Sequence, residues 1–328
     1  MRDYLIKRFI YFLLMIILVS MASFAIIQLP EGDYIDALVN ELRSQGDVVD
    51  EEIIEDLRRI YGLDKPVYEQ YFIWVLGMFQ GDFGFSLKLD QPVTSLIAER
   101  LGLTVFISLC TLVFTYAVAI PIGIISATRQ YSIFDYFFSF VGFIGLATPD
   151  FLLALVLMFT AYTQFGVEVG GLFSKEYISA DWSIDKFINM LSHMWIPVIV
   201  IGTASTAGII RVMRGCLLDE LRKPYVQTAR SKGLKEKDLI LKYPVRIALN
   251  PIISTIGWML PQVVSGSLVV SIVMSLPTTG SLLLLSLTSQ DMYLAGSIIL
   301  LLSFLTIIGT FISDILLAVS DPRIRLED

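Results

Sequence analysis

Long apolar stretches alternate with shorter polar ones along most of this 328-residue chain. A helix that crosses the ~30 Å hydrocarbon core of a bilayer needs about 20 mostly apolar residues. Six stretches meet this requirement, at residues 9–29, 102–128, 136–165, 193–213, 252–276 and 292–319. The pattern therefore predicts an all-α integral membrane protein with six transmembrane helices.

The first apolar stretch follows Arg2, Lys7 and Arg8. A secretory signal has an apolar core of about 7–15 residues and a small-residue cleavage site. Residues 9–29 are longer than such a core and lack an Ala-x-Ala ending. We therefore expect a retained first span whose positively charged start keeps the N-terminus in the cytoplasm.

The polar segment between the first two spans, residues 30–100, holds six Lys or Arg and fifteen Asp or Glu. Within it, residues 50–60 place Ile53, Ile54, Leu57 and Ile60 at helical spacing. Acids lead this short stretch and arginines follow, which suits the helix dipole. The segment is predicted to be a partly helical extracytoplasmic loop, serving as a spacer, a lid or a docking platform.

The most basic segment lies between the fourth and fifth spans. Residues 211–246 contain ten Lys or Arg and four acids, a net charge of +6 in a chain whose net charge is −7. Basic loops stay on the cytoplasmic side of the membrane. Two short helices are expected here, at residues 225–232 and 235–242, with Gly233 as a left-handed helix end and Pro244 after the second helix.

The resulting topology has both termini in the cytoplasm. It divides the chain into residues 1–29 (N-terminus and first span), residues 30–100 (extracytoplasmic loop) and residues 101–328 (five-span core). The cytoplasmic loop occupies residues 214–250 of that core. A short re-entrant or helical turn is expected at residues 277–291.

Composition then excludes several classes of function. The chain is 55% hydrophobic and 17% charged, with a mean hydropathy of +0.72, whereas soluble domains are about 25% charged. Cys110, Cys216 and the single His193 have no metal-site or redox spacing. No phosphate-binding Gly-x-x-x-x-Gly-Lys-Ser/Thr motif occurs. We therefore expect no enzyme activity, no metal or cofactor bound by this chain and no nucleic-acid partner.

Residues 225–234, Tyr-Val-Gln-Thr-Ala-Arg-Ser-Lys-Gly-Leu, are similar to the coupling loop of binding-protein-dependent ABC importer permeases. The subgroup they most resemble is the dipeptide/oligopeptide/nickel type. The general signature of the family is Glu-Ala-Ala, three residues and then Gly. This chain has Gln227, Thr228 and Ala229 before Gly233, a departure that the peptide subgroup commonly shows.

The resemblance extends over nearly the whole chain. Residues 62–71, 74–76, 81–86 and 92–93 look like the external segment of peptide-type permeases, and residues 321–325 look like the C-terminal signature. Two features depart from the family: residues 277–280 read Pro-Thr-Thr-Gly instead of Pro-Gly-x-Gly, and Thr310 replaces an Asn. These changes concern local turn geometry and one interhelical hydrogen bond.

The resemblance implies a permease subunit of an ATP-driven importer in the cytoplasmic membrane of a prokaryote. Its implied partners are a second related permease, two cytoplasmic ATPase subunits that bind ATP and Mg, an extracellular substrate-binding protein and membrane lipid. Oligopeptides are the expected cargo, with oligosaccharides or nickel as alternatives. An ion-coupled secondary transporter or an intramembrane enzyme would need paired intramembrane charges or a catalytic cluster, which the sequence does not offer.

The candidate coupling residues are Tyr225, Gln227, Thr228, Ala229, Arg230, Lys232, Gly233 and Leu234. Tyr225, Val226, Ala229 and Leu234 are expected to be presented for burial in a partner's groove. Arg230, Lys232 and Lys235 are expected to pair with acids at its rim, which orients partners more than it binds them. The alternative is a basic loop that only fixes the orientation of the protein in the membrane.

The candidate translocation pathway consists of Pro149, Asp150, Ser267, Ser271 and Ser275. Asp150 lies within the third predicted span, where a carboxylate costs at least ~2.5–3.5 kcal/mol unless it faces water or a partner. It either lines the path for a cationic or hydroxyl-bearing substrate, or caps the helix that restarts after Pro149. The serines of the fifth span either line the path or bond helices together.

Two further acids, Asp291 and Asp314, lie at the ends of predicted spans. Because water reaches span ends, we expect structural roles for both.

Overall fold

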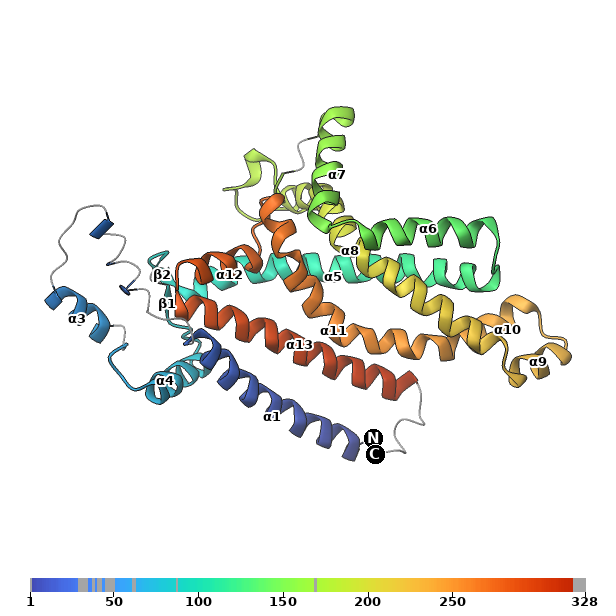
Figure 1. Ribbon diagram of the computed structural model, residues 1–328, viewed down its shortest axis with the longest axis horizontal. Helices are drawn as coiled ribbons and strands as arrows, with labels where there is room; N and C mark the ends of the chain where they lie inside the picture. The colour runs from blue at the N-terminus through green and yellow to red at the C-terminus, as the bar shows by residue number, and fades with distance from the viewer. Residues whose placement is uncertain are drawn as a thin grey trace. The chain divides into compact units, whose positions relative to one another are not determined.

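The computed structural model describes residues 2–28, 35–36, 39, 43–44, 51–60, 63–86, 88–167 and 170–320. Within these ranges the chain is almost entirely helical (Figure 1). Its helices are α1 (Arg2–Ile27), α3 (Glu51–Ile60), α4 (Val67–Phe79), α5 (Val93–Thr128), α6 (Ile133–Ala147), α7 (Asp150–Phe165), the 3₁₀ turn η1 (Lys175–Tyr177), α8 (Ile184–Leu221), α9 (Pro224–Ser231), α10 (Glu236–Lys242), α11 (Pro244–Val273), α12 (Thr279–Thr288) and α13 (Met292–Ser320). The predicted C-terminal signature at residues 321–325 lies outside the described residues.

The predicted all-α membrane architecture is confirmed, with a change in the third span. Five of the described helices are long and apolar enough to cross a membrane, or six if the α6–α7 pair counts as one span. The chain bends by 106° between these two helices (Figure 1). The third span is therefore two helices, broken at residues 148–149, where a restart after Pro149 was expected.

Several helices extend beyond the apolar stretches that predicted them. α8 begins at Ile184, where the Ser183 side chain accepts a hydrogen bond from the Lys186 backbone N at 3.1 Å. α11 begins at Pro244, a residue that suits the first turn of a helix because it needs no N–H partner there. Hydropathy marks only the part of a helix that lies in hydrocarbon, so caps set these boundaries instead.

The contacts of the chain divide it into two compact units. The first unit comprises Met1–Arg8, Val105–Pro277 and Thr306–Asp328, and the second comprises Phe9–Thr104 and Thr278–Leu305. The domain boundaries expected at residues 29 and 100 stay predictions.

The first unit is built around α8, which packs against α11, α6 and α7. Met213 and Leu217 of α8 are fully buried in a core shared with Ala119 of α5 and Ile252 of α11. Gly123 of α5 allows the closest approach, because a Cβ added there would lie 2.6 Å from the Met213 Cβ. α5 and α8 can pack this closely only with hydrogen at position 123.

The second unit contains the only β-structure among the described residues, a hairpin of β1 (Phe85–Ser86) and β2 (Gln91–Pro92). Its strands are antiparallel, with Phe85 opposite Pro92 and Ser86 opposite Gln91. β2 runs directly into α5, so the hairpin fixes where that helix starts. The adjoining core is formed by Val93, Leu96, Ile97, Leu282, Leu294 and Ile298.

Asp291 of the second unit is fully buried, which makes the expectation of a water-exposed span end wrong for this residue. Its Oδ2 accepts hydrogen bonds from the Ser86 hydroxyl at 2.6 Å and the Lys88 backbone N at 3.2 Å. Its Oδ1 accepts one from the Leu294 backbone N at 3.3 Å, in the first turn of α13. The expected structural role is present, in a buried form: Asp291 joins the hairpin to the start of α13.

Asp314, the other acid at a span end, belongs to the first unit. Its Oδ2 lies 3.3 Å from Nη1 of Arg8, and the Asp314 side chain is 21% exposed. This ion pair places the start of α1 beside the C-terminal part of α13.

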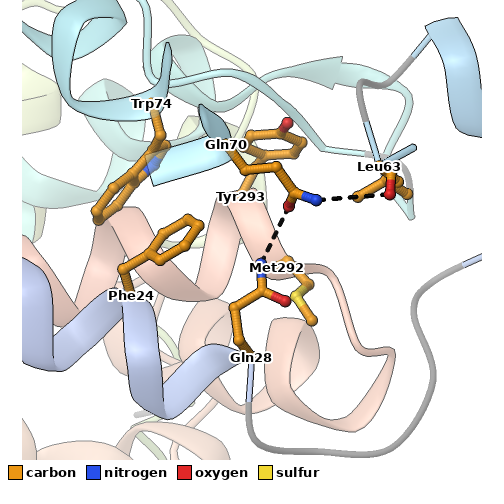
Figure 2. Close-up of a pocket in the computed structure, with 7 residues that line it drawn as sticks. All are labelled: Phe24, Gln28, Leu63, Gln70, Trp74, Met292 and Tyr293. Atoms are coloured by element: carbon orange, nitrogen blue, oxygen red, sulfur yellow. Dashed lines mark hydrogen bonds between the residues drawn. The ribbon is translucent and has the colours of Figure 1, made fainter. Parts of the chain in front are cut away.

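Also in the second unit, aromatic and amide contacts join α1 to α4. Phe24 lies 5.4 Å from the Tyr71 ring and 5.6 Å from the Trp74 ring, between centroids. Gln70 accepts a hydrogen bond from Gln28 at 3.1 Å and donates to the Leu63 carbonyl at 3.5 Å (Figure 2). The cavity between these side chains measures about 20 Å³, which is room for about one water molecule and none for a substrate.

Candidate functional site

The basic segment between the fourth and fifth predicted spans folds as α9 and α10, two short helices that follow α8 (Figure 1). Helices were predicted at residues 225–232 and 235–242, and the observed bounds are Pro224–Ser231 and Glu236–Lys242. The prediction of two helices joined at Gly233 is therefore confirmed within one residue at each end. We call this element the α9–α10 hairpin.

Glu220, in the last turn of α8, fixes the start of α9. Its buried carboxylate accepts hydrogen bonds from the Tyr225 hydroxyl and from Lys223 Nζ, both at 2.6 Å. Burial, and then the hydrogen bond and charge of Glu220, raise the pKa of Tyr225 well above its usual value. The phenol therefore keeps its proton and remains the donor in this bond, so α9 is held to the end of α8.

The two helices of the hairpin share a small core of their own. Val226 and Leu239 are 0% exposed and Ala229 is 8% exposed. Tyr225 and Ile240 pack against them, and α10 in turn packs along α11. The hairpin is thus joined to α8 at one end and to α11 at the other.

This core corrects the expected roles of Val226 and Ala229. Both were expected to enter a partner's groove, but each is buried against Leu239 of the same chain. Apolar residues at helical spacing indicate that one face of a helix is buried, without indicating what it packs against. Here the buried face of α9 packs against α10 of the same chain. The small Ala229 side chain allows α9 to lie close to α10.

Gly233 forms the turn between the two helices. Its φ of +76° lies in the left-handed region, where residues with a Cβ are strained. Its backbone N donates to the Arg230 carbonyl at 3.0 Å. No atom lies within 4 Å of where its Cβ would be. Glycine is therefore favoured here by the backbone angle and not by a lack of room for a side chain.

An ion pair closes the hairpin across this turn. Arg230 Nε lies 3.0 Å from Glu236 Oε2, and Arg230 Nη2 contacts the other carboxylate oxygen. The hydrogen bonds and charge of Glu236 raise the pKa of Arg230. Both side chains are exposed, so the pair contributes little to stability. Arg230 was expected to pair with a partner's acids, but here it is already paired within the chain.

Five exposed candidate coupling residues form what we call the hairpin surface: Gln227, Thr228, Lys232, Gly233 and Leu234. Leu234 is an exposed apolar side chain beside an exposed lysine. Among the residues that the structure describes, no group of three His, Cys, Asp or Glu is placed to hold a metal ion. The hairpin surface thus presents one basic and one apolar side chain, in a segment whose net charge is +6.

A buried ion pair that the sequence analysis missed joins α6 to α8. Arg214 Nε and Nη2 lie 2.7 and 2.8 Å from the two oxygens of Asp135. The Asp135 carboxylate also accepts a hydrogen bond from the Tyr131 backbone N at 2.9 Å, and the Asp135 backbone N donates one to the Ser132 hydroxyl at 3.3 Å. The Ser-x-x-Asp pattern signals this helix start, but no local signal identifies Arg214 as the partner.

Pro149 and Asp150 lie at the break between α6 and α7. Pro149 occupies the capping position of α7, and no side chain caps this end. Asp150 is the first residue of the helix, so the alternative in which its side chain is the N-cap is wrong. It is half-buried, and no side chain or backbone group among the described residues forms a hydrogen bond with its carboxylate. Its role in a pathway stays a prediction.

The three pathway serines do not form one stripe. Ser271 is buried and donates to the Leu268 carbonyl of its own helix at 2.8 Å. Ser275 lies beyond the end of α11, with a φ of +54°. The side chain of Ser267 lies outside the described part of the structure. The helical spacing of these serines therefore does not continue to Ser275.

Comparison with known proteins covers almost the whole chain. Residues 119–326 match the model of the binding-protein-dependent transport system inner membrane component, and residues 1–110 match the model of its N-terminal part. The chain is 34% identical to the oligopeptide transport system permease protein AppB of Bacillus subtilis (strain 168), over 99% of this chain and 100% of the relative. It is 32% identical to the oligopeptide transport system permease protein OppB of Haemophilus influenzae, over 84% and 86%. It is 28% identical to the dipeptide transport system permease protein DppB of Escherichia coli (strain K12), over 94% of each chain.

Proposed function

Because this chain belongs to the family of binding-protein-dependent transport system inner membrane components, we propose that it is the permease subunit of an ATP-driven importer of oligopeptides. Its relatives named above are oligopeptide and dipeptide permeases, which favours this cargo over oligosaccharides or nickel. The family consists of membrane subunits that are not enzymes, so ATP and Mg bind to partner subunits. Those partners are two cytoplasmic ATPase subunits, a second related permease and an extracellular substrate-binding protein.

The α9–α10 hairpin is the observation that carries this proposal. It exposes the hairpin surface while being attached to α8 through Glu220 and to α11 through packing. A displacement of the hairpin by an ATPase subunit would therefore move the cytoplasmic ends of two membrane helices together. Such rigid-body movement is how an interface event becomes a change of access.

The proposed orientation has both termini in the cytoplasm. The ion pair between Arg8 and Asp314 brings the start of α1 beside the last turns of α13. Two segments on the same side of a membrane are separated by an even number of crossings. Because the other candidate spans number five, the bent α6–α7 pair then counts as the sixth crossing. The basic loop places this side in the cytoplasm.

The pathway role of Asp150 rests on its position at the break of that bent span. A half-buried carboxylate within a membrane helix is costly unless water or a cation faces it. We place it on the translocation path, next to Pro149, where it favours cationic or hydroxyl-bearing cargo.

Replacing Lys232 and Leu234 together with glutamate tests the coupling role. The variants are co-expressed with the ATPase subunits, the second permease and the binding protein. Uptake of a radiolabelled tri-alanine peptide and ATPase co-purification are then measured. We expect both to be lost at unchanged membrane levels, because two acids replace a basic and an apolar contact. Ala229 is unsuitable for this purpose, since a larger residue there would disrupt the hairpin core.

The control is Lys242→Glu, which makes the same change of charge as Lys232→Glu at an exposed lysine at the far end of α10. It should leave assembly and uptake intact. Full uptake in the Lys232→Glu/Leu234→Glu variant would overturn the coupling role of the hairpin surface.

A further inference from the structure

A cleft of about 630 Å³ opens within the first unit, where the end of α5 meets the starts of α6 and α10. Its walls are mostly apolar, with Ile125 from α5, Phe134 and Phe138 from α6 and Leu241 from α10. This volume lies within the range of small-molecule sites. The cleft is not part of the hairpin surface.

Two cations line the cleft, Arg129 and Lys237, and no acid does. The Arg129 guanidinium lies 5.7 Å from the centroid of the Phe134 ring. Of the acids on α6 and α10, Asp135 pairs with Arg214 and Glu236 pairs with Arg230, while Asp238 does not line the cleft. The cleft therefore presents positive charge above an apolar floor.

An exposed apolar stripe continues from the cleft along α6. Phe134, Phe137, Val141 and Ile144 follow one another at helical spacing, and each is about half exposed. The ten steps from Phe134 to Ile144 rise about 15 Å along the helix, which is half of the ~30 Å hydrocarbon core. The stripe thus has the length of one leaflet, and the basic residues at its start belong to the cytoplasmic side.

We propose that this cleft binds an anionic phospholipid of the inner leaflet. The phosphate lies between Arg129 and Lys237, and one acyl chain follows the stripe on α6. Charge complementarity selects the lipid, since basic pockets between membrane helices on the cytoplasmic side suit anionic head groups. The proposal needs only a membrane location and does not depend on which substrate is transported.

Native mass spectrometry of the full purified chain tests the head-group site. Equal amounts of phosphatidylglycerol and phosphatidylcholine are added, and retained lipid is counted. A basic side chain near an anionic surface changes binding about fivefold. Arg129→Gln or Lys237→Gln should therefore weaken phosphatidylglycerol retention about fivefold, and the double variant about thirtyfold.

Lys242→Gln is the matched control, because it removes an exposed lysine of α10 that does not line the cleft. It should retain phosphatidylglycerol as the unaltered chain does. Equal retention of both lipids, or unchanged retention in the double variant, would overturn the proposal.

A second measurement tests the acyl-chain track. A bimane label on Val141→Cys, in a chain with Cys110→Ser and Cys216→Ser, is read in nanodiscs containing phosphatidylglycerol with brominated chains. Quenching in the chain assembled with its partner permease would support the proposal. An absence of quenching there would mean that protein covers the stripe, and would refute it.

Discussion

The ion pair between Arg214 and Asp135 should make a large contribution to the stability of the first unit. Both carboxylate oxygens of Asp135 are engaged, at 2.7 and 2.8 Å, and its side chain is only 3% exposed, against 28% for Arg214. Removing one partner of a buried pair costs about 3–5 kcal/mol, because the other charge remains buried. Since Arg214 is partly exposed, we expect Arg214→Gln to lower the free energy of unfolding by about 3 kcal/mol.

A double-mutant cycle separates the pair from its surroundings. The full chain is unfolded reversibly in mixed micelles of mild detergent and SDS, and the free energy of unfolding is compared for Arg214→Gln, Asp135→Asn and the double variant. The double variant should be more stable than the sum of the single losses predicts, because no unpaired charge is left. The Tyr131 and Ser132 hydrogen bonds at this helix start can form in all three variants.

Arg211→Gln is the control, because Arg211 is an exposed residue of the same helix. It should change the free energy of unfolding by less than about 0.5 kcal/mol. If Arg214→Gln and Asp135→Asn each cost no more than this control, and their effects simply add, the reasoning about this pair is wrong.

Two further substitutions test packing and the pathway. Gly123→Ala should destabilise the chain by about 1–3 kcal/mol, because its Cβ would lie 2.6 Å from the Met213 Cβ. Gly208→Ala should leave stability unchanged, because no atom lies within 4 Å of its Cβ position. Equal effects of the two substitutions in the same SDS titration would contradict this packing argument. Asp150→Asn should lower the uptake rate of a lysine-containing tripeptide relative to tri-alanine, because it removes a negative charge from the proposed path; unchanged uptake of both peptides would remove Asp150 from that path.

Local signals in the sequence predicted the α9–α10 hairpin well. Gly233 and Pro244 each act within a few residues of the helix ends that they set. The prediction of which side chains face a partner was partly wrong, however, because Val226 and Ala229 are buried inside the hairpin. An apolar pattern identifies a covered face without identifying what covers it, and Leu239 covers Val226 from within the same chain.

Contacts between distant parts of the chain were beyond the reach of such signals. Ser86 and Asp291 are 205 positions apart, and Asp135 and Arg214 are 79 apart. Likewise, Pro149 predicted a break in the third span, but the angle of 106° depends on how α6 and α7 each pack against α8. Hydropathy located the membrane helices, and the side chains that hold them in place had to be found in the structure.

The buried carboxylate of Asp291 restricts how the starts of two membrane helices can move relative to each other. It accepts a hydrogen bond from Ser86 in the β1–β2 hairpin, which leads into α5, and another from the first turn of α13. Pulling these helix starts apart would leave an anion without donors in a place that water does not reach. A conformational change that keeps these hydrogen bonds therefore moves the beginnings of α5 and α13 together, so that relative movement of helices has to occur along other helix boundaries.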